Sequence, residues 1–474
     1  MEKHSFDGNI LIVGFGSIGQ GVLPLLLRHF DVPSERITIV TGDERGAEIA
    51  QEYDVRFDIT PLTPDTYESI ICSHIGRGDF LLNVSTDVSS PALIELCQKN
   101  DILYIDTVLD MWSDRYVDDR FLSHADRSLY ALREKTLQLR NLPIDGPRPT
   151  AVLAHGANPG LVSHFVKKAL LNIAADTGLS ATEPIAREGW AQLARQLGIK
   201  VIHIAERDTQ NSDIPKKLGE FVNTWSIEGF AWEGYHPPEL GWGSHEKELP
   251  KDAHTHEFGC GSAIYIEKPG FATKVHSWTP TSKAQHAWVI THHEAISIAD
   301  FLTVKEGNEV MYRPTVHYAY HPCDDAILSI HELMGNNGTI QNEVRLLNGD
   351  ITPGGVDDLG VLLMGHKKGA YWYGSRLSID EARRVIPHNN ATGLQVTASI
   401  IGAMAWAMKH PKAGIVEAEE LDHSFVLDIA NPYLGEVFGT YTNWTPIEGR
   451  EQGALFPEAL DTEDPWQFSN FIVS

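Results

Sequence analysis

The segment NILIVGFGSIGQ, Asn9–Gln20, determines the architecture of the first part of the chain. Its apolar first half predicts a short buried strand, and the residues from Ser17 onward predict a helix with leucines along one side. The turn between them has the pattern G-x-G-x-x-G, formed by Gly14, Gly16 and Gly19. A strand, a glycine turn and a helix in this order are typical of a parallel α/β sheet whose first turn holds a pyrophosphate.

Short apolar segments alternate with helix-like segments as far as residue 156, which predicts a doubly wound parallel sheet. The expected strands after the first cover residues 36–41, 55–59, 79–84, 102–107 and 150–154, and the expected helices include 90–99 and 126–139. Beyond residue 156 the chain is rich in Trp, His, Gly and Pro and has short strand-like pieces, which predicts a second α/β domain with a mixed sheet. Residues 389–408 predict a long, largely buried helix, capped by Asn390 or Thr392.

The net charge of −26 argues against nucleic-acid binding, because neutralising phosphates requires clustered Lys and Arg. An acidic surface attracts cationic ligands, although the same charge also serves solubility. The chain has no run of 18 apolar residues and no signal-peptide pattern, so we expect a cytoplasmic protein with no membrane partner. Its four cysteines are far apart, and His254, His256 and Cys260 lack a fourth ligand at zinc spacing. We therefore expect neither a disulfide framework nor a metal site.

The glycine turn and the helix that follows it predict a dinucleotide site. Gly14 permits the tight turn, Gly16 lets the backbone approach a pyrophosphate, and Gly19 lets helix and strand pack closely. Helix N–H groups then face the phosphates, so the cofactor-binding residues here are Gly14, Gly16, Ser17, Ile18 and Gly19. Asp43, shortly after the second strand, is the expected ribose partner and favours NAD over NADP, while the nearby Arg45 leaves NADP open.

Polar residues follow the later strands of the same predicted sheet. In doubly wound sheets, ligands lie beyond the carboxyl ends of the strands. Asn83, Ser85 and Asp87 after one strand, and Thr107 and Asp110 after the next, are therefore candidates for the nicotinamide side. Turn and helix-cap chemistry is the competing interpretation of each of these residues.

The second half contains residue types suited to a diammonium ligand, which needs carboxylates and an aromatic face. Glu206 follows the strand VIHIA, and Trp225 lies close in sequence to Glu233. His292, separated by one residue from Glu294, can exchange protons near neutral pH. Core packing is the competing interpretation of the Trp, because the chain has 11 of them. On residue chemistry alone, the chain is an NAD-dependent enzyme, with a cationic substrate as one option.

Long motifs spread over nearly the whole chain resemble bacterial homospermidine synthases. They are GFGSIG at Gly14, YIDTV at Tyr104, GANPG at Gly156, IAERDTQ at Ile204, VNTWSIEGF at Val222, ELGWG at Glu239, SWTPT at Ser277, HEAISIADFLTV at His293, YRPTVHYAYHPC at Tyr312, YWYGS at Tyr371, NATGLQV at Asn390 and DPWQF at Asp464. That family is similar to saccharopine dehydrogenase in fold. The resemblance implies a Rossmann NAD-binding domain over 1–156, a substrate-binding and dimerisation α/β domain over 157–388, and a C-terminal segment, 389–474, that returns to the first domain.

The resemblance also implies the reaction. One amine of putrescine is oxidised to an imine with formation of NADH, and the amine of a second putrescine, or of spermidine, attacks that imine. Ammonia leaves, and the same NADH reduces the new imine, which gives homospermidine with no net redox change. The enzyme is thus an NAD-dependent transferase, expected by analogy to be a homodimer.

Roles for individual residues follow from the same resemblance. Trp225 is similar to the residue that stabilises the charged intermediate through a cation–π interaction, and Glu206 and Glu233 to carboxylates that hold ammonium groups. The remaining pocket residues implied are Asn158, Asp87 and Asp110 at the nicotinamide end, and His292, Glu294 and Asp357 in the second domain. Asp110 stands in VLDMW, where the family pattern has a Glu.

Two other functions remain open on the sequence. A reductive-condensation dehydrogenase of the saccharopine or carboxyspermidine type, using NAD(P)H, would need an Arg or Lys to pair with a substrate carboxylate. Arg207 and Arg313 are the residues to examine for that role. An NAD-binding protein without catalytic activity is the second alternative, because fold does not fix function.

Overall fold

The computed structural model describes residues 3–112, 123–144, 146–179, 182–450 and 459–473. The chain forms two compact units, one of residues 1–161 and 381–434, the other of residues 162–380 and 435–474. Each unit is therefore assembled from two separate stretches of sequence.

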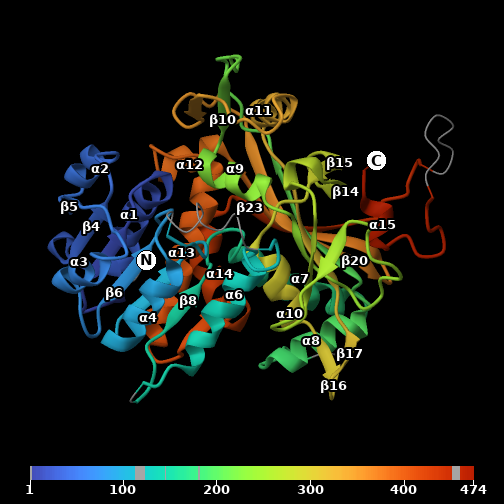
Figure 1. Cartoon of the computed structure of the whole chain (residues 1–474), viewed down its shortest axis with the longest axis horizontal. Helices are drawn as coiled ribbons and strands as arrows, with labels where there is room; N and C mark the ends of the chain where they lie inside the picture. Colours follow the sequence, from blue (N-terminus) through green and yellow to red (C-terminus); the bar gives the residue numbers. More distant parts are fainter. Residues whose placement is uncertain (1–2, 113–122, 145, 180–181, 451–458, 474) are drawn as a thin grey trace. The chain divides into compact units, whose positions relative to one another are not determined.

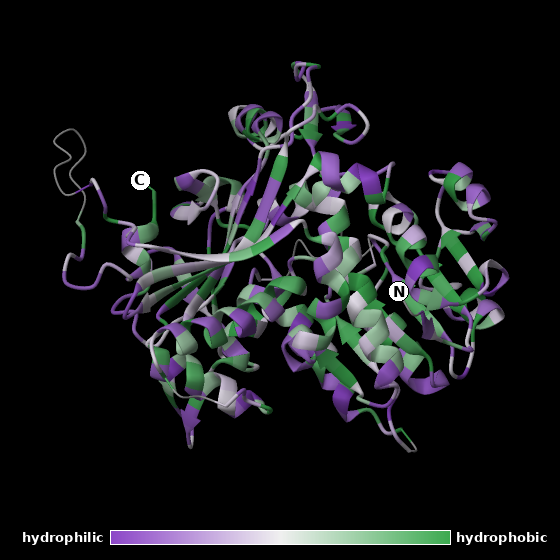
Figure 2. Ribbon diagram, turned by 180° about the vertical axis from the view of Figure 1, so that it is seen from behind, coloured by the Kyte–Doolittle hydropathy of each residue, from purple (hydrophilic) through white to green (hydrophobic). Residues whose placement is uncertain are grey.

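The first unit contains a seven-stranded sheet, with strands in the order β22-β8-β7-β6-β2-β4-β5 (Figure 1). All of its strand pairs are parallel. The strands are β2 (Ile10–Val13), β4 (Ile37–Thr41), β5 (Arg56–Ile59), β6 (Phe80–Asn83), β7 (Leu103–Asp106), β8 (Ala151–Leu153) and β22 (Ile415–Glu417). β2 is buried along its whole length, as in a parallel sheet covered on both faces, and the strands near it are drawn mostly in hydrophobic green in Figure 2. The doubly wound parallel sheet expected from the sequence is confirmed.

Helices connect and cover these strands. They include α1 (Ser17–His29), α2 (Ala47–Glu52), α3 (Tyr67–His74), α4 (Ser90–Asn100), α6 (Leu129–Gln138), α13 (Ala391–Lys409) and α14 (His423–Ala430). The long helix α13, orange in Figure 1, packs against the blue α1 and against α14. Its N-cap is Asn390, whose side chain accepts a hydrogen bond from the Gly393 N–H at 2.9 Å. By length and composition α13 could cross a membrane, but 83% of its most apolar window is buried within the protein, as in a core helix.

The second unit is built on a ten-stranded sheet with the main order β12-β13-β11-β18-β9-β20-β21-β23. β9 and β18 run parallel, whereas their other neighbours pair antiparallel, so the sheet is mixed, as expected. Its strands are β9 (Val201–Asp208), β11 (Glu239–Gly241), β12 (Ala253–Thr255), β13 (Ala263–Ile266), β14 (Lys274–Thr279), β15 (Lys283–Trp288), β18 (Thr315–His321), β20 (Val356–His366), β21 (Gly369–Ser378) and β23 (Glu436–Thr442). Helices of this unit include α7 (Leu161–Asp176), α8 (Arg187–Leu197), α9 (Ile227–Tyr235), α10 (His293–Phe301) and α11 (Asp324–Gly335).

The C-terminal stretch 389–474, expected to return as a whole to the first domain, is divided at residue 434. β22 joins the parallel sheet beside β8. β23 instead pairs with β21 of the second sheet along its length, and the Val473 N–H donates to the Lys274 carbonyl at 2.9 Å. Backbone hydrogen bonding therefore places the last part of the chain in the second unit.

A buried carboxyl holds the end of the chain against this second sheet. The side chain of Glu246 is 1% exposed. It accepts hydrogen bonds from the N–H of Phe468, in the short helix α15 (Phe468–Phe471), at 2.8 Å and from the Thr315 hydroxyl at 2.5 Å. Burial raises the pKa of Glu246 to about 7, so in the folded protein its protonated form predominates below about pH 7.

This raised pKa predicts a pH-dependent stability. A carboxyl with a folded pKa above its unfolded value contributes stability that is complete at low pH and lost as pH rises through the folded pKa. We expect Glu246→Gln to gain about 2–3 kcal/mol of unfolding free energy relative to the parent between about pH 5 and about pH 8. Denaturant unfolding of both proteins across this range measures it. If the difference in unfolding free energy between Glu246→Gln and the parent stays constant with pH, the pKa of Glu246 is not raised.

Candidate active site

The glycine turn between β2 and α1 is tight at two positions and open at the third. Gly14 has φ +85°, and a Cβ there would lie 2.7 Å from the backbone of Ser85; a Cβ on Gly19 would lie 2.8 Å from the Gly14 carbonyl oxygen. At Gly16 no heavy atom lies within 4 Å of the Cβ position. Ser17 and Ile18 begin α1, whose first turn carries no acidic residue. The open backbone and the positive helix end suit an anionic group.

Asp43, the expected ribose contact, already has a charged partner. Its carboxylate accepts the Arg45 N–H at 2.9 Å and Nε–H at 2.8 Å, and these hydrogen bonds lower the pKa of Asp43. Both side chains are exposed, at 45% and 77%. A ribose hydroxyl would therefore have to share Asp43 with Arg45.

Polar residues after β6 and β7 form two hydrogen-bonded groups. Asn83 accepts a hydrogen bond from the Ser85 hydroxyl at 2.6 Å. The Asp110 carboxylate accepts the backbone N–H of Asp87 at 2.8 Å and that of Met111 at 2.7 Å. The structure thus gives Asp110 the turn-stabilising chemistry that was the competing interpretation, while Asp87 keeps an exposed side chain.

The loop after β8 joins this edge of the sheet. The Gly156 N–H donates to the Pro159 carbonyl at 2.7 Å, which closes the loop that carries Asn158. A Cβ on Gly156 would lie 3.6 Å from the Cβ of Thr107, so the loops after β7 and β8 are adjacent. Within the first unit, the polar residues expected near the cofactor therefore follow neighbouring strands at their carboxyl ends.

Three buried acids share one face of the second sheet. In the register of β9, Glu206 stands opposite Tyr320 of β18, and Asp208 stands opposite Asp357 of β20. Glu206 is 2% exposed, and the two aspartates are fully buried. Asp208, which sequence reasoning did not single out, accepts the Thr224 hydroxyl at 2.6 Å, and burial raises its pKa.

An imidazole lies between two carboxylates at the start of α10. The Nδ1 of His292 is 3.1 Å from Glu294 Oε1, and its Nε2 is 3.1 Å from Oε2 of Glu233 on α9. Burial disfavours the imidazolium, but the charges of Glu294 and Glu233 outweigh it and hold the pKa of His292 well above its usual value. Burial also raises the pKa of Glu233, against the opposing charge of His292. Glu233 and His292 can therefore exchange a proton with each other.

Two tyrosines of β18 connect the other candidates. The Trp225 indole N–H donates to the Tyr320 hydroxyl at 3.1 Å, and the Tyr318 hydroxyl donates to Glu206 Oε2 at 2.6 Å. The rings of Tyr318 and Tyr320 stack with centroids 5.2 Å apart, and the His292 ring lies 4.4 Å from that of Tyr318. Trp225, Glu206 and His292 thus belong to one linked set within the second unit. Both tyrosines belong to the motif YRPTVHYAYHPC, but they are distant in sequence from Glu206 and Trp225, so the motif did not reveal these contacts.

The two arginines that could pair with a substrate carboxylate instead form hydrogen bonds with the protein. Arg207 donates to the Pro322 carbonyl at 2.8 Å and pairs with Asp324 at 3.0 Å. Arg313 donates to the carbonyls of Trp242 at 2.5 Å and Gly261 at 2.8 Å. Both guanidinium groups are therefore occupied by structural contacts.

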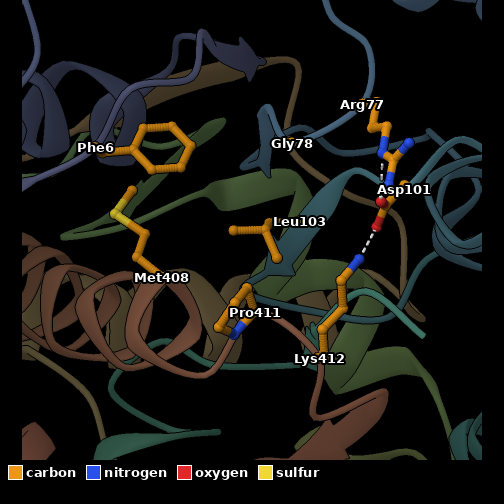
Figure 3. Close-up of a pocket in the computed structure, with 8 residues that line it drawn as sticks. All are labelled: Phe6, Arg77, Gly78, Asp101, Leu103, Met408, Pro411 and Lys412. Atoms are coloured by element: carbon orange, nitrogen blue, oxygen red, sulfur yellow. Dashed lines mark hydrogen bonds and ion pairs between the residues drawn. The ribbon is translucent and has the colours of Figure 1, made fainter. Parts of the chain in front are cut away.

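A cavity of 370 Å³ lies at the amino-terminal ends of the first unit's strands. It is lined by Phe6, Arg77, Gly78, Asp101, Leu103, Met408, Pro411 and Lys412. Figure 3 shows that Arg77 and Lys412 both reach Asp101, whose carboxylate is 3.1 Å from Arg77 Nε and is also paired with Lys412. Ligands of doubly wound sheets bind at the opposite ends of the strands, so this cavity is separate from the candidate active site.

Family models match almost the whole chain. The saccharopine dehydrogenase NADP binding domain matches residues 10–145, and the saccharopine dehydrogenase C-terminal domain matches residues 156–439. Together the two models cover every strand of the parallel sheet except β8, and most of the second unit.

Individual proteins match over their full length. The homospermidine synthase of Blastochloris viridis is 50% identical and covers 99% of this chain and 98% of its own length. That of Mesorhizobium japonicum is 48% identical, with 98% and 96% covered. A crystal structure of the homospermidine synthase of Legionella pneumophila in complex with NAD has 49% identity, a TM-score of 0.92, and covers 100% of this chain and 99% of its own.

Proposed function

Because this chain belongs to the homospermidine synthase family, we propose that it condenses two putrescines, or putrescine and spermidine, to homospermidine with release of ammonia. The observation that carries this proposal is the set of buried carboxylates around Trp225 and His292 in the second unit. Carboxylates and an aromatic face are what a diammonium substrate requires.

The first unit supplies a fitting site for NAD. The open position at Gly16 and the start of α1 at Ser17 and Ile18 suit the pyrophosphate, with Gly14 and Gly19 shaping the turn. We assign Asp43 to the ribose, and Asn83, Ser85, Thr107 and Asn158 to the nicotinamide side. When bound, NAD would supply hydride transfer, accepting a hydride from the amine-bearing carbon of putrescine and returning it to the condensed imine.

The acids of the second unit bind the ammonium groups of the substrate. Glu206 and Glu233 hold the two ends by charge-assisted hydrogen bonds, and Asp357 adds negative charge on the same sheet face. Trp225 stabilises the cationic intermediate through the face of its indole ring. In the first unit, we assign Asp87 and Asp110 to the nicotinamide end of the site, Asp87 through its exposed carboxylate.

The His292 group moves protons. The second amine must lose a proton before it attacks the imine, and the first nitrogen must gain one proton before it leaves as ammonia. His292, held between Glu233 and Glu294, can take up the one and supply the other, so that the proton count balances. Glu233, whose pKa burial raises, is the second proton-exchanging group.

The competing saccharopine- or carboxyspermidine-type reaction is disfavoured by the arginines. Its substrate carries a carboxylate, which calls for a free guanidinium or ammonium group. Arg207 and Arg313 are both committed to backbone carbonyls. The described contacts of the site therefore favour a purely cationic substrate.

Incubation of the purified protein with NAD and putrescine tests the proposal. Homospermidine and ammonia should form, as followed by mass spectrometry, without lasting NADH absorbance. Lasting NADH with no condensed product would indicate a simple amine dehydrogenase. The absence of any reaction would favour the saccharopine- or carboxyspermidine-type reaction, whose substrate carries a carboxylate.

We further propose that the enzyme is a cytoplasmic homodimer that pairs through the lobe formed by α11, β10 (Glu220–Asn223) and β19 (Glu343–Leu346). Large apolar side chains are exposed there, which is characteristic of protein interfaces. They are Ile214, Leu218, Leu328, Met334, Ile340, Val344 and Leu346.

Val344 lies on this lobe and is 57% exposed. We expect Val344→Glu to shift the protein from dimer to monomer, because the substitution would bury a charge in the interface. Size-exclusion chromatography coupled to light scattering measures the mass of the particle in solution. Ile59→Glu is the control, because Ile59 is exposed on the first unit. A parent that is monomeric, or a Val344→Glu variant that stays dimeric, would contradict this interface.

A further inference from the structure

One strand supplies the two hydroxyls that hold the candidate substrate residues. Tyr318 and Tyr320 are two positions apart on β18, so their side chains lie on the same face of the sheet. Both are buried, at 2% and 0% exposure. Their rings are nearly parallel, with an interplanar angle of 14°, so neither can rotate without displacing the other.

Tyr320 controls the orientation of Trp225. Its hydroxyl accepts the indole N–H at 3.1 Å, and Phe230 packs against the same indole with ring centroids 5.2 Å apart. The indole is thus held by its N–H edge on one side and by a ring on another. A cation–π contact depends on the direction in which the ring face points, so the hydroxyl of Tyr320 determines how well Trp225 can meet a cation.

Tyr318 has the corresponding role for Glu206 and His292. Its hydroxyl donates to Glu206 Oε2 at 2.6 Å, which fixes the position of the carboxylate. Its ring lies against the imidazole of His292 at 4.4 Å. A shift of Tyr318 would therefore displace the carboxylate and the imidazole together.

We propose that Tyr318 and Tyr320 are positioning residues of the condensation reaction, Tyr320 acting through Trp225 and Tyr318 acting through Glu206. The inference rests on the proposed function. Tyr320 sets the reactivity of the charged intermediate and so acts on kcat. Tyr318 sets the ammonium site and so acts on KM for putrescine.

Double-mutant cycles test this inference, because a residue that acts through another loses its effect once that other residue is changed. Loss of one hydroxyl hydrogen bond should lower kcat about three- to tenfold in Tyr320→Phe and raise KM by a similar factor in Tyr318→Phe. Tyr320→Phe should have little further effect in a Trp225→Phe background, and Tyr318→Phe little in a Glu206→Gln background.

Tyr312→Phe is the matched control. The Tyr312 hydroxyl donates a single hydrogen bond to the Ile199 carbonyl at 2.9 Å in the same unit, away from the linked set. It should change the thermal midpoint at most and leave kcat and KM at parental values. Thermal unfolding of all variants separates a loss of fold from a loss of positioning.

The possible outcomes are distinct. Effects that vanish in the second backgrounds support the inference. The inference is wrong if the effects of the two substitutions add in full in the double variants. It is also wrong if Tyr318→Phe and Tyr320→Phe have kinetics like those of Tyr312→Phe. In both cases an active parent still supports the proposed function. A parent that forms no homospermidine refutes the function and this inference with it.

Discussion

Replacement of His292 by Gln should lower kcat for homospermidine formation by about a hundredfold or more, as expected for loss of a general acid–base group. Each ring nitrogen of His292 lies 3.1 Å from a carboxyl oxygen, an arrangement that favours the imidazolium, which donates from both nitrogens. Gln can retain one of these bonds but cannot take up or release a proton near neutral pH. Proton transfer between the attacking and leaving amines would then depend on Glu233 or water.

Steady-state kinetics of product formation, measured at several pH values, provide the test. His254→Gln is the control, because His254 also pairs with a carboxylate, that of Glu267, but is 48% exposed. The control should keep parental kcat. If His292→Gln is folded and turns over putrescine at the parental rate, His292 has no part in proton transfer.

Glu206→Gln should lower kcat/KM for putrescine about ten- to a hundredfold, the value of a hydrogen bond to a charged group. The substitution keeps the shape of the side chain and an oxygen that can accept from Tyr318. It removes the negative charge from a site that is only 2% exposed, where solvent screens an ammonium group poorly.

Kinetics and direct titration of putrescine into the NAD-loaded enzyme measure this effect. Glu228→Gln is the matched control, since Glu228 belongs to the same unit and is exposed on α9. Equal losses of putrescine binding in both variants would mean that the substrate responds only to the overall negative charge of the protein. Unchanged binding in Glu206→Gln would remove Glu206 from the ammonium site.

Much of the first unit was predictable because its signals are local. The apolar run of Ile10–Val13 and the glycines after it determine a strand and a turn without help from distant residues, and Asn390 marks the start of α13 as expected. β22 was not predicted. It has only three residues, Ile415–Glu417, and becomes a strand through its pairing with β8, more than 250 residues earlier in the chain.

The candidate site was predictable only in its residue types. The types and motifs around Trp225, Glu206 and His292 indicated a diamine pocket, but their connection through β18 depends on the register between β9, β18 and β20. Asp208 and Tyr318 lie within the family motifs, but a motif does not show the partners of its residues: the hydrogen bond from Tyr318 to Glu206 joins positions 112 residues apart. For Asp110, the structure shows backbone contacts that the sequence allowed as one of two readings.

The discontinuous make-up of both units has a consequence for biosynthesis. The parallel sheet lacks β22 until residue 417 has been added, and the mixed sheet lacks β23 until residue 442. A nascent chain leaving the ribosome therefore carries two unfinished sheets with unpaired edges for most of its translation. Such edges and their apolar faces are aggregation-prone, so production of this enzyme should depend on chaperones that shield the growing chain until its final residues emerge.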